Sequence, residues 1–452
     1  SSDLTNSATL NFDGNSHVNW NTLNLNSNET LNFNAVNGAT GLTVLNTVNH
    51  GMSNIYGTIN ANSGIGKLII SNPNGVLFGE GASVNVNSLT VSTMDATFDN
   101  DKNILKLTKG ADQSDYGIKV ENGANIYGDK NVTFATDNIT VYSGSKISTN
   151  TGVNVDDEAY GKVKLVTSDG VNFEYYNNGA VKDIPNSSIK TSSDKMTLSV
   201  NGDIESGHVD MRNYSTNKDS DINLNGATIK AVKAVKGNDG NIWLTSANKI
   251  VSEGSAYGAG GNIRFLAADK NSVGSSNLNA AGNVDIISQN NNAIVGEASK
   301  VKAGNNLNIT AGKVASVQEN SELTAKNINI KGANAYISNA KLTADEKIAA
   351  EATEKDVWVS NATLKANEID LTAANDVFGD ADVQNNLTKV KAGNDINLNL
   401  KNVGNQKKGL VAEAGKNVTI ETDGTLSVSR IVAEDGDVNI TADKVIAGLP
   451  YT

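Results

Sequence analysis

The 452-residue sequence contains no cysteine, which excludes disulfide bonds and thiolate metal sites. It has three prolines and only three arginines (Arg212, Arg264 and Arg430). Its net charge is −12 and its pI is about 4.9. Nucleic acid and anionic membranes are both recognised through a basic face, so neither is expected as a partner. No apolar run reaches the length of about 20 residues that a membrane-spanning helix needs.

Aromatic residues are also scarce, at 5%, whereas glycine is abundant, with 42 residues. Short alternating apolar pairs are separated throughout by Gly, Asn, Ser and Thr. This composition is typical of many short strands joined by many turns, and not of an ordinary α/β enzyme. The regular spacing of the apolar pairs argues against disorder, the other expectation for so polar a chain.

An internal repeat becomes plain after residue 240. An apolar doublet recurs with its first members at Ile242, Ile263, Val284, Leu307, Ile328, Ile348, Ile369, Ile396, Val418 and Val438. The steps are 20 to 23 residues, apart from one of 27. A period kept over 200 residues indicates stacked units. Leucine-rich repeats have a similar period, but their leucine runs and helical segments are missing. We therefore predict an all-β, right-handed parallel β-helix.

Asparagine precedes many of these doublets, at positions 241, 262, 283, 305 and 394. Stacked at equivalent corners of successive coils, such side chains would form a hydrogen-bond ladder. The alternative is that they simply suit the turns, and the two interpretations are compatible.

Three parts follow from the pattern. Residues 1–98 are expected to form an N-terminal cap, with Trp20 over the first coils, and the coils that carry the motif described below. Residues 99–230 are less regular, and we expect hairpins or a small subdomain to protrude from them. Their densest aromatic cluster, Val171–Tyr176, is interpreted as packing in preference to ligand binding. Residues 231–452 are expected to be regular repeats of about 21–22 residues that continue beyond Thr452.

The sharpest local signal is Asn72-Pro73-Asn74-Gly75, between the expected strands 67–71 and 76–78. Pro73 fixes φ near −65° and lacks an N–H, which suits the second position of a tight turn. Asn74 and Gly75 tolerate backbone conformations that most residues avoid. By itself, such a tetrapeptide predicts only an ordinary turn.

The surrounding residues add a family resemblance. The run from Ser53 to Ile59, then Leu-Ile-Ile-Ser-Asn-Pro-Asn-Gly-Val-Leu-Phe-Gly at 68–79, resembles the secretion domain of two-partner-secretion exoproteins. The entry segment His17–Trp20 is similar to the same family. A second short motif, Asn-Pro-Asn-Leu, is absent, so the high-molecular-weight-adhesin branch matches better than the filamentous-haemagglutinin branch. The resemblance covers roughly residues 10–95.

This resemblance implies a function and a set of partners. The chain would be a fragment of a large adhesin or haemagglutinin, secreted to the outer surface of a Gram-negative bacterium after passage through the periplasm. Its partner during export would be an outer-membrane barrel transporter with periplasmic domains. Asn72, Pro73, Asn74 and Gly75 would act either in transporter recognition or in nucleating the fold. We further expect a monomer, a receptor on a host or neighbouring cell, and no nucleic-acid partner.

Two other functions remain open at the level of sequence. One is a polysaccharide-active β-helix enzyme, and the other is the shaft of a contact-dependent growth-inhibition toxin. No carboxylate pair with neighbouring aromatics marks a glycosidase site, and we predict no enzyme activity and no cofactor. The acidic cluster 156–158 is interpreted as a solvated loop in preference to a calcium site. His17, His50 and His208 lack metal-ligand spacing and are interpreted as ordinary polar residues. Because Ser1 is followed by no basic and apolar leader, we expect the signal peptide to have been removed.

Overall fold

The structure, a computed structural model, describes residues 6–151, 161–232, 240–384, 387–401 and 409–450. Its internal contacts divide the chain into two compact units. Unit 1 comprises Ser1–Ile250 with Ser255–Gly261, and unit 2 comprises Val251–Gly254 with Asn262–Thr452. In the described part of the chain, every regular element is a β-strand except one short 3₁₀ helix, η1 (Asn186–Ser188). None of the helical structure described has the length and apolar character needed to cross a membrane.

The strands of unit 1 are β1 (Asn6–Phe12), β2 (Ser16–Trp20), β3 (Glu29–Ala35), β4 (Leu42–Val48), β5 (Ser53–Ile55), β6 (Thr58–Ala61), β7 (Ile65–Ser71), β8 (Val76–Phe78), β9 (Ser83–Ser92), β10 (Asp95–Asp99), β11 (Ile104–Thr108), β12 (Ile118–Val120), β13 (Asn125–Thr136), β14 (Asn138–Val141), β15 (Lys146–Thr149), β16 (Lys162–Thr167), β17 (Gly170–Glu174), β18 (Thr197–Val200), β19 (Asp203–Ser206), β20 (His208–Asn213), β21 (Asp221–Asn225), β22 (Thr228–Ala231), β23 (Ile242–Ser246) and β25 (Ala256–Ala259). The residues of β24 (Lys249–Glu253) are divided between the two units.

The strands of unit 2 are β26 (Ile263–Ala267), β27 (Asn271–Gly274), β28 (Asn277–Ala280), β29 (Val284–Ser288), β30 (Ala293–Gly296), β31 (Lys300–Ala303), β32 (Asn306–Ala311), β33 (Val314–Val317), β34 (Glu322–Gly332), β35 (Asn334–Ser338), β36 (Lys341–Ala352), β37 (Val357–Lys365), β38 (Glu368–Ala373), β39 (Val377–Gln384), β40 (Leu387–Ala392), β41 (Ile396–Lys401), β42 (Leu410–Ala414), β43 (Val418–Thr422), β44 (Thr425–Ala433), β45 (Val438–Thr441) and β46 (Lys444–Ala447).

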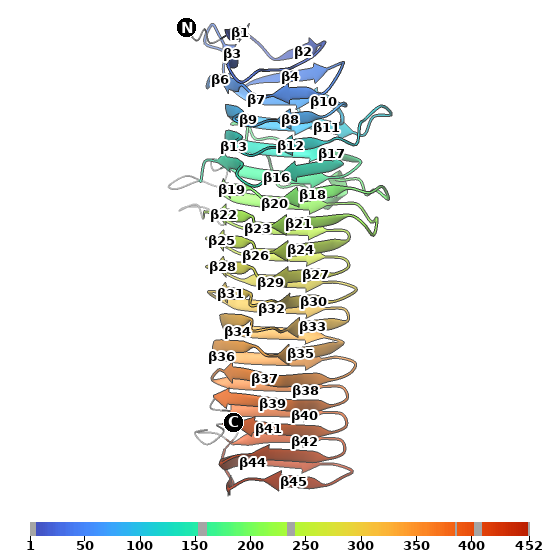
Figure 1. Cartoon of the computed structure of the whole chain (residues 1–452), viewed down its shortest axis with the longest axis vertical. Coiled ribbons are helices and arrows are strands. Elements are labelled where there is room, and N and C mark those ends of the chain that lie inside the picture. The colour runs from blue at the N-terminus through green and yellow to red at the C-terminus, as the bar shows by residue number, and fades with distance from the viewer. Residues whose placement is uncertain (1–5, 152–160, 233–239, 385–386, 402–408, 451–452) are drawn as a thin grey trace. The chain divides into compact units, whose positions relative to one another are not determined.

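Each unit is a stack of coils in which a strand pairs in parallel with its equivalents in the coils before and after it. In unit 1, one face runs through β4, β7, β9, β13, β16 and β20. A second face runs through β5, β8, β12, β14, β18 and β21. The strands of unit 2, coloured yellow to red in Figure 1, form successive layers in the same way. This arrangement confirms the predicted all-β parallel β-helix.

Columns of aliphatic side chains fill the interior of the stack. In unit 2, Ile263 pairs with Val284, and the column continues through Leu307, Ile328, Ile348 and Ile369, all fully buried. The next doublet, at Ile396, leaves this column and pairs with Val377 on a different face. The repeat predicted as one series therefore covers two faces, which explains its single 27-residue step.

The predicted asparagine ladder is present at two of its positions in unit 2. Oδ1 of Asn262 accepts the backbone N–H of Asn283, and Oδ1 of Asn283 accepts that of Asn306, at 2.8 and 3.0 Å. These two bonds each join a side chain to the backbone of the next coil, and at the following step Nδ2 of Asn327 donates to Oδ1 of Asn306 over 3.2 Å. Asn305 is not part of it, because Asn306 makes the contact. These bonds link successive coils at their corners.

Aromatic side chains connect the first strands of unit 1. Trp20 pairs in register with Val48, and its indole N–H donates to Oδ1 of Asn46 over 2.9 Å. Phe12 and Phe33 stack with their ring centroids 6.1 Å apart. Trp20 thus contacts the coil that follows it, and its capping role remains a prediction. The three-part domain division itself remains a prediction.

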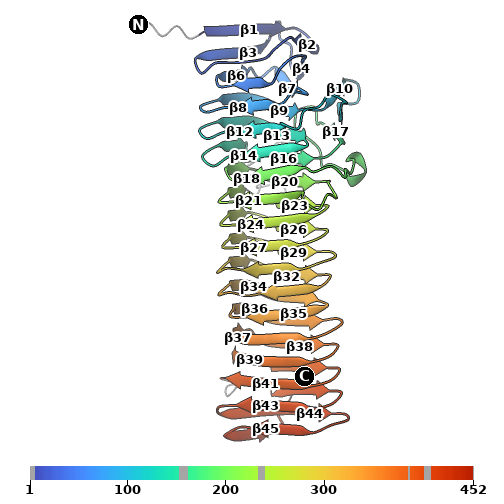
Figure 2. The same ribbon diagram turned by 45° about the vertical axis from the view of Figure 1, so that its right-hand side comes forward.

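A second, antiparallel sheet lies outside the coils of unit 1. It is formed by β10, β11 and β17, whose register pairs Phe98 with Leu105 and Leu105 with Phe173. Figure 2 shows β10 and β17 beside the layers of β9, β13 and β16. This sheet confirms the extra-helical hairpin predicted within residues 99–230, although the hairpin begins earlier, at Asp95.

Candidate functional site

The Asn72–Gly75 turn joins β7 to β8 in unit 1, as the sequence predicts. The backbone N–H of Gly75 donates to the carbonyl of Asn72 over 3.0 Å, which closes a tight turn. Gly75 has φ +108°, a conformation that side-chain-bearing residues rarely adopt. The four predicted residues are contiguous in the chain, and the fold holds them as a single compact turn.

Asn72 is fully buried and acts as the anchor of this turn. Its Nδ2 donates to the carbonyl of Gly51 over 3.0 Å and to Oγ of Ser53 over 2.9 Å, both in the preceding coil. Its Oδ1 accepts the backbone N–H of Asn74 over 2.9 Å. An unpaired buried amide would cost about 1–3 kcal/mol, so these bonds make Asn72 a specific link between two coils.

Residues 114–117, in the loop before β12, cover the other side of the turn. The backbone N–H of Ser114 donates to the carbonyl of Pro73, and that of Val76 donates to the carbonyl of Gly117. A Cβ placed on Gly75 would lie only 2.5 Å from Cδ1 of Tyr116. Glycine is therefore required at this position both by its backbone conformation and by the close ring.

The folded turn offers little of itself to a partner. Asn72 and Gly75 are buried, and Pro73 and Asn74 are half-buried between neighbouring segments. All four residues are therefore fully accessible to a binding partner only before these coils have folded. This burial argues against a partner that binds the folded turn. The two roles expected from the sequence, transporter recognition and nucleation of the fold, both remain predictions.

The outer sheet of β10, β11 and β17 encloses a second hydrophobic core on the outer face of the coils. Leu45 and Ile69 point outward from the coils into it, and Leu105 and Phe173 meet them from the outer sheet. Tyr175, directly after β17, joins the same core. The phenolic OH of Tyr175 hydrogen bonds to Oγ1 of Thr90 on β9. The predicted packing role of the aromatic cluster 171–176 is confirmed for Val171, Phe173 and Tyr175, which are buried, while Tyr176 is half-buried.

A charged network lies beneath the segment that follows β17. Lys164 is completely buried, and its Nζ lies 3.7 Å from Oδ2 of Asp210 and 3.8 Å from Oδ1 of Asp183. Burial lowers the pKa of Lys164 to about 8, against the opposing effect of Asp210. Burial by itself would raise the pKa of Asp210, but Lys164 and Arg212 hold it below its ordinary value.

Arg212 connects this network to the outer segment. Its guanidinium binds both carboxylate oxygens of Asp210 at 2.9 to 3.1 Å. It also donates to the carbonyl of Ile184 over 2.9 Å and to Oδ1 of Asn186 over 3.3 Å. Arg212 therefore fastens the outer segment to strand β20.

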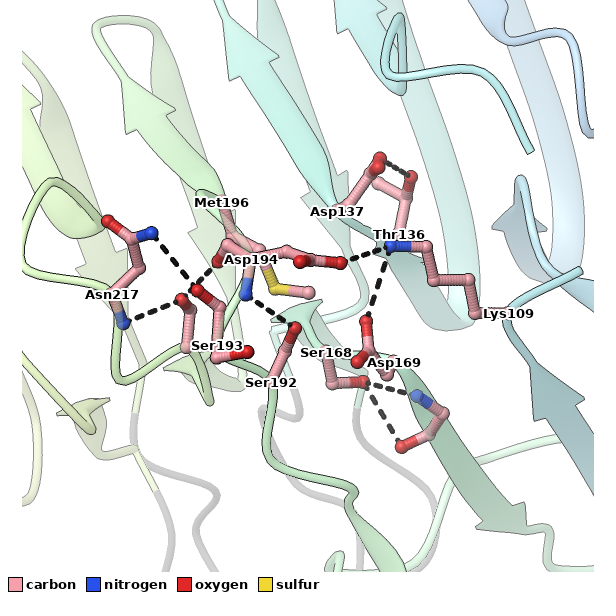
Figure 3. Close-up of polar contacts among 12 residues, drawn as sticks. Lys109, Thr136, Asp137, Ser168, Asp169, Ser192, Ser193, Asp194, Met196 and Asn217 are labelled. Atoms are coloured by element: carbon pink, nitrogen blue, oxygen red, sulfur yellow. Dashed lines mark hydrogen bonds and ion pairs between the residues drawn. The ribbon is translucent and has the colours of Figure 1, made fainter. Parts of the chain in front are cut away.

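Lys109 forms a second fastening, shown in Figure 3. Its Nζ lies 2.7 Å from Oδ2 of Asp194 and 3.7 Å from Oδ1 of Asp169. The hydrogen bond to Asp194 raises the pKa of Lys109 above its ordinary value. Nearby, burial raises the pKa of Asp137, whose Oδ1 accepts a hydrogen bond from Thr136. Lys109 thus joins three segments that are remote in sequence.

The histidines and the acidic cluster were the other candidate site residues in the sequence. Nε2 of His17 contacts Oγ1 of Thr47 at 2.8 Å, which fits an ordinary polar role. His208 is buried against the ring of Trp243, and burial lowers its pKa to about 3. The acidic cluster 156–158 lies outside the described residues. Among those described, no group of three or more His, Asp or Glu side chains is arranged to hold a metal ion.

Comparisons with known proteins address the whole chain. Among curated protein sequences, none matches it. The structure is similar to the crystal structure of the HMW1 secretion domain from Haemophilus influenzae, with 14% sequence identity, a TM-score of 0.31 and 96% of each chain covered. The family model of the TPS secretion domain matches residues 2–244, more than half of the sequence. The chain therefore belongs to the TPS, or two-partner-secretion, secretion-domain family, as the resemblance of its Asn72–Gly75 region had indicated.

Proposed function

We propose that residues 2–244 direct the export of this chain through a dedicated outer-membrane barrel with periplasmic domains in a Gram-negative bacterium. The coils that follow serve as the shaft of an adhesin- or haemagglutinin-like exoprotein, displayed on the outer cell surface and without enzymatic activity. The family match supports the export role. The repetitive coils of unit 2 support a structural shaft.

The observation that carries the proposal is the burial of Asn72 within a turn that links two coils. A motif that is enclosed after folding acts while the chain is still extended, as it emerges from the transporter. Closing the turn outside the cell fixes the register of the first coils at low entropic cost. Each further coil then adds ladder hydrogen bonds and buried aliphatic area, which helps to draw the remaining chain outward.

The proposal is tested by weakening the turn and following export. The double variant Asn74→Ala/Gly75→Ala removes the side-chain amide of Asn74 and places a Cβ where Tyr116 leaves no room. The parent and the variant are expressed with the partner barrel, and the protein outside the cell is compared with that retained in the periplasm. We expect the exported fraction of the variant to fall severalfold, while the purified variant retains β-sheet circular dichroism.

A matched control is available in Gly226→Ala. Gly226 also has positive φ, at +66°, but it has open space around its missing Cβ and lies outside the motif. This variant also places an alanine at positive φ, without disturbing Asn72. If the motif variant and the control are exported equally well, the motif is an ordinary turn.

A further inference from the structure

A column of aromatic side chains lies on the outer face of unit 2. The strand register places Tyr336 of β35 beside Trp358 of β37, and Trp358 beside Phe378 of β39. Tyr336 is 37% exposed and Trp358 is 45% exposed. The rings of Trp358 and Phe378 meet edge to face, with their centroids 4.0 Å apart. Three consecutive coils thus each carry an aromatic side chain at the same position of the column.

The fold does not require aromatics at this position. Before Tyr336, the same column contains Ser316, and after Phe378 it contains Asn397. The aromatic residues are therefore confined to three coils, between small or polar residues that build the same sheet. Large apolar side chains left in water, with a polar residue in the coil before and in the coil after them, indicate a contact surface.

The columns on either side carry hydrogen-bonding groups. Asp356 and Asp376 flank the aromatics on one side, and Ser338 and Ser360 flank them on the other, all half-buried. Oδ1 of Asp356 accepts the backbone N–H of Asp376 over 3.2 Å, which holds this carboxylate in a fixed orientation. No lysine or arginine occupies these four flanking positions.

We propose that this face binds a neutral oligosaccharide that lies along the aromatic column. The C–H faces of pyranose rings carry slight positive charge and pack against the negative faces of aromatic rings. Carboxylates and hydroxyls on both flanks accept and donate hydrogen bonds to sugar hydroxyls. Three coils at about 4.8 Å per step provide a surface about 10 Å long, which accommodates about two sugar rings.

The chemistry of the face selects this ligand over two others. The flanking carboxylates repel sulfated, sialylated or uronic glycans, and no nearby basic side chain in the flanking columns offsets the repulsion. A protein partner needs a broad interface of roughly 800 Å² per side with an apolar centre. Here the apolar surface is a single column wide. A neutral sugar chain matches both its shape and its charge.

The proposal supplies a ligand class for the adhesive role proposed above and rests on that part of it. Export depends on the turn in unit 1, whereas the aromatic column lies wholly in unit 2. Binding is measured on purified protein, without any secretion step. A chain that is exported normally but binds no neutral glycan would overturn this inference alone.

The test is an array of neutral oligosaccharides of glucose, galactose, mannose and N-acetylglucosamine, with sulfated and sialylated glycans as separate arms. The full chain is compared with Trp358→Ser, which copies the serine found at Ser316 in the same column. The matched control is Tyr142→Ser, which removes an aromatic that is 40% exposed in unit 1. We expect neutral glycans to bind the parent and the control, and to bind Trp358→Ser about tenfold or more weakly.

Three results would overturn the proposal: no neutral glycan binds the parent, anionic glycans bind in preference, or Trp358→Ser binds as well as the parent. Circular dichroism establishes whether the variant keeps its β structure. If Trp358→Ser does not fold, Phe378→Asn replaces it, because Asn397 occupies the next place in the column. The same outcomes then apply to that variant.

Discussion

The side-chain amide of Asn72 donates a hydrogen bond of 2.9 Å to Oγ of Ser53, 19 residues earlier in the chain. This bond joins the turn of one coil to the start of a strand in the coil before it. The Asn72–Gly75 turn is thereby part of the interior of the first coils, and the second donor contact of Asn72, to the carbonyl of Gly51, strengthens the same link.

Replacing Asn72 with alanine is expected to destabilise unit 1 by about 1–3 kcal/mol, because two donor contacts and the acceptor within the turn are lost together. Urea unfolding followed by circular dichroism measures the change. Asn60→Ala is the control, since the half-buried Asn60 makes one side-chain bond, to Asn32 over 3.2 Å. Equal losses in the two variants would contradict the anchoring role of Asn72.

Arg212→Ala should release the segment between β17 and β18, because the guanidinium holds both Ile184 and Asp210. We expect a protease of chymotrypsin specificity to cleave residues 175–196 several times faster in this variant than in the parent. Lys190→Ala, an exposed change in the same segment, provides the control. Unchanged cleavage of Arg212→Ala would show that the hydrophobic core alone holds the segment.

Lys164 predicts a dependence of stability on pH. Its pKa is about 8 in the folded chain, against 10.5 for an ordinary lysine. Between these values the unfolded chain binds the proton and the folded chain does not, so the free energy of unfolding rises with pH, by at most about 1.4 kcal/mol per unit. Below pH 8 both states are charged, and the full cost of burying the cation is present.

Lys164→Met removes that cost while leaving Asp210 paired with Arg212. The stability of the variant relative to the parent should therefore decrease as the pH rises from 8 to 10.5, and urea unfolding at several pH values measures it. Asp183, Lys162 and His208 also influence this network, and all three remain in the variant. A difference that stays constant across this pH range would refute the assignment.

Much of the fold is predictable because it repeats. The doublets from Ile263 to Ile369 follow a near-constant period, and the structure stacks them in one buried column. The same reasoning failed at Ile396, because a doublet pattern does not reveal which face of the coil a strand occupies.

The aromatic column could have been found in the sequence. Tyr336, Trp358 and Phe378 follow one another at steps of 22 and 20 residues, which match the period of the doublets. Equal period implies equal position in successive coils, so the three residues were expected to share one column. Their exposure to solvent could not be predicted, because the sequence pattern alone does not separate outer from inner columns.

The ion pairs and hydrogen bonds that hold the outer sheet and the segment after it could not be predicted from the sequence. Lys109 and Asp194 are 85 residues apart, and they meet only because two excursions leave the coils on the same face. Lys164 and Arg212 occupy outward positions of β16 and β20, where charged residues are ordinarily exposed. They are buried only because the segment between β17 and β18 covers them. That segment contains no sequence repeat from which its position could be predicted.

The most direct test of the account is the amount of the chain found outside the cell with and without its outer-membrane barrel. We expect the protein to accumulate in the medium or on the cell surface only when the barrel is present. Without the barrel, the chain should be retained in the periplasm and degraded there. Equal extracellular amounts in the two strains would contradict export by a dedicated partner.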